Sequence, residues 1–105
     1  MKISHHQTET IILSALAIHP MHGYALSGIL RKELPQTFKF GVGMLYPILH
    51  KLEKRQLIVG EWRDVAGQQK KVYSLTKKGK KEQTELAKQW AAFSGVVSKF
   101  IKRTV

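Results

Sequence analysis

The chain has 105 residues, which fits one domain with a modest core, and small domains of this size are commonly stabilised by pairing with a second copy. Its net charge of +11, carried mostly by the second half of the chain, favours a polyanionic partner, and nucleic acid more than a membrane surface. The absence of cysteine excludes disulfides and Cys-based zinc sites, and with no secretory signal and no apolar run of about 18 residues a soluble cytoplasmic protein is expected.

Two helices are predicted in the first third of the chain. The first covers about residues 7–19 and ends before Pro20, which cannot continue a helix. After a tight turn over residues 19–23, the second covers about residues 23–34 and ends before Pro35. The residues at helical spacing are Ile11, Ile12, Ala15, Leu16 and Ile18 in the first helix and Leu26, Ile29, Leu30 and Leu34 in the second.

A third helix, beginning near Val42, carries the most informative pattern in the chain. Its apolar residues are spaced i, i+3, i+4 and i+7, so they form one stripe against a core: Leu45, Ile48, Leu49 and Leu52. The face turned to solvent or to a partner carries Met44, Tyr46, Pro47, His50 and Lys51. Pro47 is expected within or just after the first turn, where its missing amide proton costs least.

A β-hairpin and a last helix complete the predicted fold. Residues 58–64 and 70–75 are rich in β-branched and aromatic residues, and residues 65–69 between them supply the turn. Thr76 is a suitable N-cap for a helix over about residues 77–103. Three helices followed by a hairpin is the order of a winged helix-turn-helix, so we expect a mainly α fold with a small β-hairpin and a long C-terminal helix.

The last helix carries a second apolar stripe, whose residues are spaced 4, 3, 4 and 3 apart: Leu86, Trp90, Phe93, Val97 and Phe100. This spacing is typical of a helix that pairs with another helix. We therefore expect residues 1–76 to form the DNA-binding domain and residues 77–105 to form a dimerisation helix, the two together making one structural unit. Trp90 and Phe93 fit two interpretations: plain dimer core, or a slot in which symmetry-related tryptophans stack on a flat aromatic effector. Both interpretations require a homodimer.

Several short motifs are distributed over nearly the whole chain: His22-Gly23-Tyr24, Leu45-Tyr46-Pro47, Leu49-His50-Lys51-Leu52-Glu53, Leu57-Ile58, and Tyr73-Ser74-Leu75-Thr76 followed by Gly79. Together they resemble the motifs of the PadR-like transcriptional regulators. The resemblance implies a dimeric repressor that binds an inverted-repeat operator and releases it when a small effector binds or conditions change. The single C-terminal helix is similar to the compact subfamily, some of whose members bind planar hydrophobic drugs at the dimer interface. Two departures are Met44, where the family usually has Thr, and Gln68 and Gln69, where the wing tip is usually Arg-rich.

The candidate DNA-binding residues lie on and before the third helix and on and after the hairpin. A recognition helix enters the major groove, where its side chains reach base edges and phosphates. The lysines between residues 70 and 81 favour phosphate contact, although a solvated surface is the alternative interpretation. Lys77 and Lys78 begin a helix, where the macrodipole disfavours cations, so an external anion would relieve this conflict. The candidates are Lys39, Met44, Tyr46, His50, Lys51, Gln69, Lys70, Lys71 and Lys77.

Catalytic and metal-binding patterns are missing from the sequence. His19 and His22 have H-x-x-H spacing, but no Cys or acidic residue is near them in sequence, so turn packing and capping are the preferred interpretation. No nucleophile–base set and no Gly-rich phosphate loop are visible, so neither an enzyme nor a cofactor is expected. The alternatives to a DNA-binding repressor are a winged-helix protein–protein or RNA-binding module, and a drug-binding protein with little DNA role.

Overall fold

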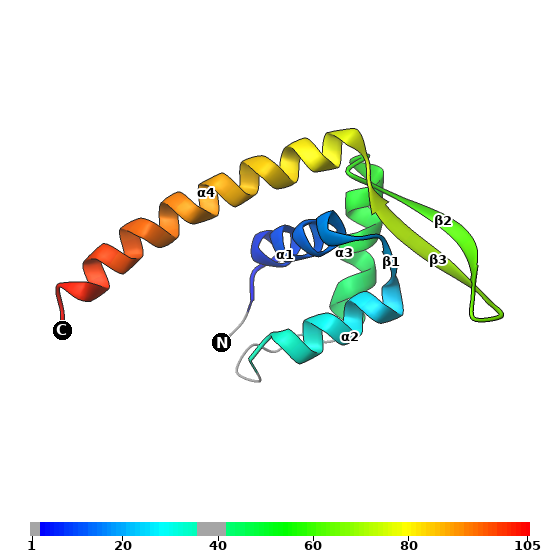
Figure 1. The fold of residues 1–105 in the computed structure, drawn as a ribbon, viewed down its shortest axis with the longest axis horizontal. Coiled ribbons are helices and arrows are strands. Elements are labelled where there is room, and N and C mark those ends of the chain that lie inside the picture. Colours follow the sequence, from blue (N-terminus) through cyan, green and yellow to red (C-terminus); the bar gives the residue numbers. More distant parts are fainter. Residues whose placement is uncertain (1–2, 36–41) are drawn as a thin grey trace.

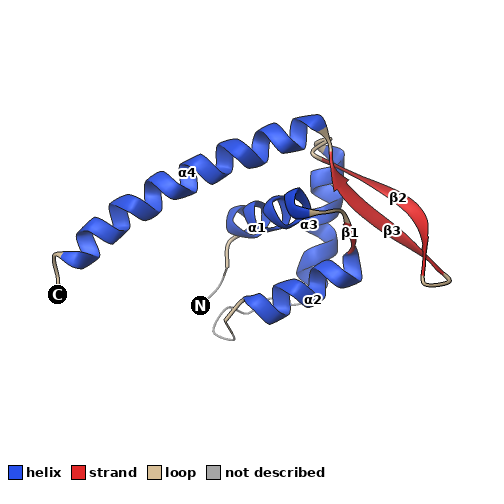
Figure 2. Cartoon of the chain, in the orientation of Figure 1, coloured by secondary structure: helices blue, strands red, loops and turns tan. Residues whose placement is uncertain are grey.

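The computed structural model describes residues 3–35 and 42–105, which form four helices and a three-stranded antiparallel sheet (Figure 2). The elements are α1 (His5–Ile18), β1 (Met21–His22), α2 (Gly23–Glu33), α3 (Val42–Lys54), β2 (Ile58–Val65), β3 (Gln68–Leu75) and α4 (Lys77–Lys102). Helices α1, α2 and α3 form a head, from which the β2–β3 hairpin, here called the wing, projects on one side and α4 extends on the other (Figure 1). The expected mainly α, winged helix-turn-helix fold with a long last helix is confirmed.

Local capping interactions set the starts of three helices. Ser4 forms a capping box with Gln7: Ser4 Oγ accepts a hydrogen bond from the Gln7 N–H at 3.1 Å, and Gln7 Oε1 accepts one from the Ser4 N–H at 2.9 Å. His22 Nδ1 accepts from the Ala25 N–H at 3.1 Å and caps α2, which confirms its predicted capping role. The Thr76 hydroxyl caps α4, as predicted, by accepting from a backbone N–H three residues later at 2.9 Å.

The sheet contains one strand that the sequence did not predict. Residues 21–22, expected to belong to a turn, form β1, which pairs with β3 and places Met21 opposite Tyr73. The strand order is therefore β1–β3–β2. A strand of two residues is too short to show an alternating pattern, which is why the sequence did not reveal it. This pairing ties the start of α2 to the base of the wing.

The wing is longer than predicted. Its strands reach Val65 and Gln68, so the turn lies within the predicted residues 65–69 but is shorter than predicted. Only Ala66 and Gly67 remain in the turn, and both have positive φ, 51° and 81°. Two consecutive residues of positive φ give a tight hairpin turn whose twist matches that of the strands.

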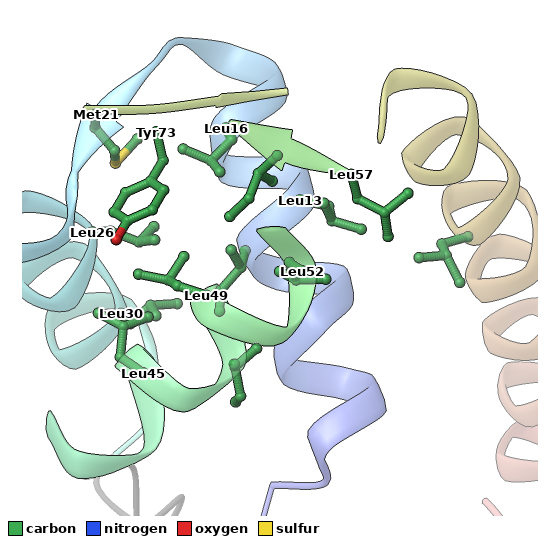
Figure 3. Close-up of a cluster of buried hydrophobic side chains, with 14 residues drawn as sticks. Leu13, Leu16, Met21, Leu26, Leu30, Leu45, Leu49, Leu52, Leu57 and Tyr73 are labelled. Atoms are coloured by element: carbon green, nitrogen blue, oxygen red, sulfur yellow. The ribbon is translucent and has the colours of Figure 1, made fainter. Parts of the chain in front are cut away.

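The core lies between the three helices of the head and the inner side of the sheet (Figure 3). The stripe predicted for α3 is fully or almost fully buried. Ile18 and Ile29 differ from the prediction and are exposed, because one ends α1 and the other lies at the edge of the buried side of α2. The buried cluster consists of Ile12, Leu13, Leu16, Met21, Leu26, Leu30, Leu45, Ile48, Leu49, Leu52, Leu57, Ile58, Tyr73 and Leu86.

Pro47 is the sixth residue of α3, just after the first turn, as predicted. At this position an ordinary N–H would already bond to the carbonyl of Gly43, so the proline removes one helical hydrogen bond. Pro47 therefore destabilises α3 more than the sequence argument assumed. Pro47 lies on the exposed face, so its ring displaces no core residue.

Helix α4 is docked on the head through its first ten residues. Gly79 packs so closely against the Leu57 carbonyl that a Cβ there would collide with it. Gln83 Nε2 donates to Ser14 Oγ of α1 at 3.3 Å, and Leu86 joins the core. Beyond Leu86 the helix leaves the head (Figure 1), and every following residue is exposed. Neither α4 nor another helix in the described segments is long and apolar enough to cross a membrane.

Candidate nucleic-acid interface

A cleft of about 290 Å³ lies between the start of α2, the exposed face of α3 and the wing; we call it the α3–wing cleft. It is bordered by His22, Gly23, Tyr24, Tyr46, Trp62, Lys70, Lys71 and Tyr73. Aromatic rings and two ammonium groups therefore dominate its surface, and none of the described residues that border it is acidic. A surface of this composition suits a partner that carries both negative charge and flat or apolar groups.

The exposed face of α3 carries the side chains that the sequence predicted. His50 and Lys51 are exposed and Met44 is half-buried. Among the described residues, neither His50 nor Lys51 has a hydrogen-bonded or ion-paired side-chain partner. These two side chains are free to meet a groove.

Tyr46, half-exposed on the same face, leans toward the start of α2. Its ring lies over Gly23, where an added Cβ would come within 3.0 Å of the Tyr46 hydroxyl oxygen. The absence of a side chain at position 23 therefore allows the ring to approach the α2 backbone. The phenol borders the α3–wing cleft and is held near its wall.

The two neighbouring lysines of the wing have different surroundings. Lys71 Nζ lies 3.0 Å from Glu53 Oε1 and 5.5 Å from the centre of the Tyr73 ring. The hydrogen bond to Glu53 raises the pKa of Lys71, and burial opposes this rise only in part. Lys70 Nζ lies 5.6 Å from the Tyr24 ring centre and has no acidic partner among the described residues. Both were predicted to contact DNA, but the structure gives Lys71 a partner within the chain.

The remaining predicted contacts have mixed surroundings. Lys77 is exposed at the start of α4, whereas Lys78 Nζ donates a hydrogen bond to the Arg55 carbonyl oxygen at 3.1 Å. The argument that the helix dipole leaves both cations in need of an external anion therefore applies to Lys77 alone. Gln69 is exposed in β3, and Lys39 lies outside the described residues.

Two exposed aromatic residues of the cleft were missed by the sequence analysis. Tyr24 is the second residue of α2, and Trp62 lies in β2 opposite Lys71. Strand alternation places Trp62 on the same face as Ile58, which is buried in the core. That alternation was readable in the sequence and would have turned Trp62 toward α3.

The histidines near Pro20 serve the turn and show no sign of a metal site. His19 Nδ1 lies 3.0 Å from the Pro20 carbonyl oxygen, and His22 caps α2. Nowhere in residues 3–35 and 42–105 do three His, Cys, Asp or Glu side chains gather as metal ligands would.

A second surface is formed by residues 87–102 of α4, which lie beyond Leu86 and are here called the free part of α4. The exposed fraction of the predicted stripe ranges from 37% at Val97 to 61% at Phe100, and the rings of Trp90 and Phe93 lie 5.9 Å apart at 39°. Leu86 differs, because it is 9% exposed and packed in the core. The apolar surface left for a partner therefore starts at Trp90.

An apolar cavity of about 560 Å³ lies between α1, the segment after α2 and Trp90. Its wall is formed by Ile3, His6, Gln7, Thr10, Ile11, Ser14, Ala15, Ile18, Leu34, Pro35 and Trp90. Trp90 borders this cavity and Phe93 does not, although their two rings lie 5.9 Å apart. The wall residues from α1 were not predicted, because their partner surface comes from a helix about 75 residues later in the chain.

Comparison with known proteins places these surfaces in a family context. Residues 12–85 match the model of the transcriptional regulator PadR-like family. The transcriptional regulator Rv3488 of Mycobacterium tuberculosis is 35% identical over 77 residues, which cover 69% of this chain and 72% of that protein.

Solved structures show the same architecture. A PadR-like transcriptional regulator from Bacillus cereus is 30% identical, with a TM-score of 0.82 over 90% of each chain. The protein smu.1704 from Streptococcus mutans is 26% identical, with a TM-score of 0.87 over 97% of this chain and 92% of that chain. The residues that match the family model, 12–85, include α3 and the wing, which border the α3–wing cleft.

Proposed function

The chain belongs to the PadR-like family of transcriptional regulators, which are not enzymes, and we propose that it is a homodimeric repressor that binds an inverted-repeat operator in duplex DNA. The observation that carries this proposal is the pairing of the exposed face of α3 with the basic and aromatic wall of the wing. Recognition helices place a few side chains on base edges, while nearby cations hold phosphates. Lys51 and His50 supply the first kind of contact and Lys70 the second.

The proposed dimer rests on the free part of α4. Trp90, Phe93, Val97 and Phe100 expose apolar surface that a monomer would leave in water. A second copy of α4 covers such a stripe with the same residues, as two-fold symmetry requires. The head with its wing then occurs twice and reads two half-sites of an inverted repeat.

The experiment that tests this function starts with selection of duplex fragments by the purified protein and footprinting of the selected sites. Affinity for the protected sequence is then compared with that for a scrambled duplex at several salt concentrations. Lys51→Met should weaken operator binding by about tenfold, within the ~1–3 kcal/mol expected for a base or phosphate contact. Lys102→Met, which removes the same charge at the far end of α4, is the matched control and should have little effect.

Other results would favour the alternative functions. Equal affinity for the footprinted and scrambled duplexes would remove sequence specificity. Tighter binding to single-stranded RNA than to any duplex would favour an RNA-binding module instead. An aromatic ligand bound tightly by a protein that shows no duplex preference would favour a drug-binding role.

The cavity beside Trp90 supports a second part of the proposal, a small hydrophobic or aromatic effector. A pocket of this size with a mostly apolar wall and an indole ring can stack a flat ring system. Because the cavity lies between α1 and α4, a bound molecule would alter the angle of α4 to the head. The separation of two heads that must match two half-sites would change with that angle.

A flat aromatic cation such as acridine orange is a suitable probe for this site. In a Trp62→Phe background it should quench the fluorescence of Trp90, and Trp90→Ala should weaken its binding by about tenfold or more, as loss of stacking implies. Phe93→Ala is the comparison, because Phe93 does not border the cavity and should matter less. Unchanged affinity in Trp90→Ala would return Trp90 to plain dimer core.

A further inference from the structure

The wing projects beyond the core, so the direction of its outer part depends on contacts outside the core as well as on its buried base. At its base Ile58, Val72 and Tyr73 are buried, whereas residues 61–64 and 66–69 are exposed. Figure 1 shows the wing tip standing away from the helices. A two-stranded hairpin without packing is marginally stable by itself. A side chain that links the outer part of the wing to α3 therefore restrains the direction in which the wing points.

Lys71 makes such a link from β3. Its ammonium reaches Glu53 in the last turn of α3 at 3.0 Å, and the two side chains keep 33% and 28% of their exposure. Its stem passes over Gly60 of β2, where an added Cβ would collide with Lys71 Cε and force the lysine stem to shift. The glycine thus provides the path along which Lys71 crosses the wing toward α3. The raised pKa of Lys71 agrees with an ammonium group that is held by its partner.

Lys70 has none of these features. Strand alternation directs neighbouring residues to opposite faces, and Lys70 Nζ lies over the ring of Tyr24, which is itself exposed. Among the described residues it has no acidic partner. Its charge is therefore available to an external anion, while the charge of Lys71 is already paired.

We propose that Lys71 is a positioning residue whose ion pair with Glu53 fixes the wing relative to α3, and that Lys70 is the wing lysine that binds the DNA backbone. The second half of this proposal rests on the proposed DNA-binding function. The first half concerns the protein alone and is testable without DNA. The division predicts that two adjacent lysines, identical in charge, differ both in their effect on hydrogen exchange and in their effect on DNA binding.

The first experiment measures amide hydrogen exchange of β2 in the protein without DNA. Lys71→Met keeps the stem and removes the charge, and Glu53→Gln removes the partner charge. Both should raise exchange in residues 60–64 several-fold, whereas Lys70→Met should leave it unchanged. Gly60→Ala changes no charge but blocks the path of Lys71, and it should raise exchange like Lys71→Met. Unchanged exchange in all of these variants would overturn the positioning role.

The second experiment measures binding to the operator and to random duplex as a function of salt. Lys70→Met should weaken both by a similar factor and lower the salt slope by about one unit, because a phosphate contact carries no sequence information. Lys71→Met should weaken operator binding by about five- to tenfold with nearly unchanged slope, because a misplaced wing disturbs only the complex that needs both elements in register. Equal slope losses for the two variants would overturn the division.

A charge exchange separates positioning from phosphate contact. Lys71→Glu alone should lose operator binding, and the combination of Glu53→Lys with Lys71→Glu should recover much of it, because the pair is rebuilt at the same net charge. A phosphate contact at position 71 would give no recovery, since a carboxylate would then face the backbone. Wild-type protein that fails to prefer any duplex would overturn the proposed function and the role of Lys70. The amide hydrogen exchange of the protein without DNA would still decide the role of Lys71.

Discussion

The head and the free part of α4 use the same hydrophobic spacing with opposite results. In α3 the residues at i, i+3, i+4 and i+7 are almost fully buried within the chain. In α4 the equivalent stripe from Trp90 to Phe100 is at least one-third exposed. Helical spacing therefore indicates an apolar face but does not indicate whether the chain's own core covers that face. The exposure of the residues in the folded chain supplies this second piece of information.

The boundary between the two regions lies inside one helix. Up to Leu86, α4 is docked on the head, because Gly79 packs on the Leu57 carbonyl and Leu86 joins the core. Beyond it every residue is exposed, including Trp90, which borders the cavity beside α1. A single helix thus has a first part that stabilises the fold and a second part that is available for assembly.

The largest expected effect comes from placing charges on the free part of α4. Phe93→Glu combined with Val97→Glu should give monomers in sedimentation experiments and weaken operator binding by about 100-fold, because the two heads are no longer linked. Lys88→Glu, on the opposite side of the helix, is the control and should remain dimeric. A wild-type protein that sediments as a monomer at micromolar concentration would contradict the prediction.

The next-largest effect tests whether Leu86 belongs to the docked start of α4 or to its free part. In the monomeric double variant, Leu86→Ala should lower the free energy of unfolding by ~2–4 kcal/mol, as expected for a buried leucine. Phe100→Ala in the same background should change it by less than ~0.5 kcal/mol, because its ring is exposed. Urea unfolding measures both, and equal effects would place the boundary elsewhere.

The docked start of α4 and its free part can also be compared by the same substitution, glycine to alanine, at one position in each. Gly79→Ala should destabilise the protein by ~1–3 kcal/mol, because the new methyl group meets the Leu57 carbonyl. Gly95→Ala should stabilise it by ~0.5–1 kcal/mol, since no atom lies within 4 Å of the new Cβ and alanine favours the helix. Thermal unfolding of the two variants should therefore shift in opposite directions.

The smallest expected effect is a loss of stability at alkaline pH. The hydrogen bond to Glu53 raises the pKa of Lys71 above its usual 10.5, and burial raises the pKa of Tyr73 above its usual 10.0. The folded protein thus holds both protons more tightly than the unfolded chain, so stability is retained below about pH 10 and falls as pH rises through the folded values. The drop should be ~1 kcal/mol or less, because Lys71 is one-third exposed and screened by water. Urea unfolding at about pH 8 and about pH 11 should show a smaller drop for Glu53→Gln and for Tyr73→Phe.

The sequence by itself determined the helices, the caps of α2 and α4, and the order of the fold, whereas the Ser4 cap of α1 was not predicted. Periodicity and capping involve residues three or four positions apart, so Thr76, His22 and the stripe of α3 had the predicted roles. The resemblance to the PadR-like family was likewise carried by short local motifs, and the family match over residues 12–85 confirms it.

Only the tertiary structure decided which residues of similar chemistry have different roles. The pairing of Lys71 with Glu53, the burial of Leu86 and the strand at residues 21–22 depend on contacts between segments distant in sequence. Lys70 and Lys71 look alike in the sequence because charge and spacing are local, whereas the presence of a partner depends on where α3 lies. The surroundings of each side chain are fixed by packing, and no local pattern encodes them.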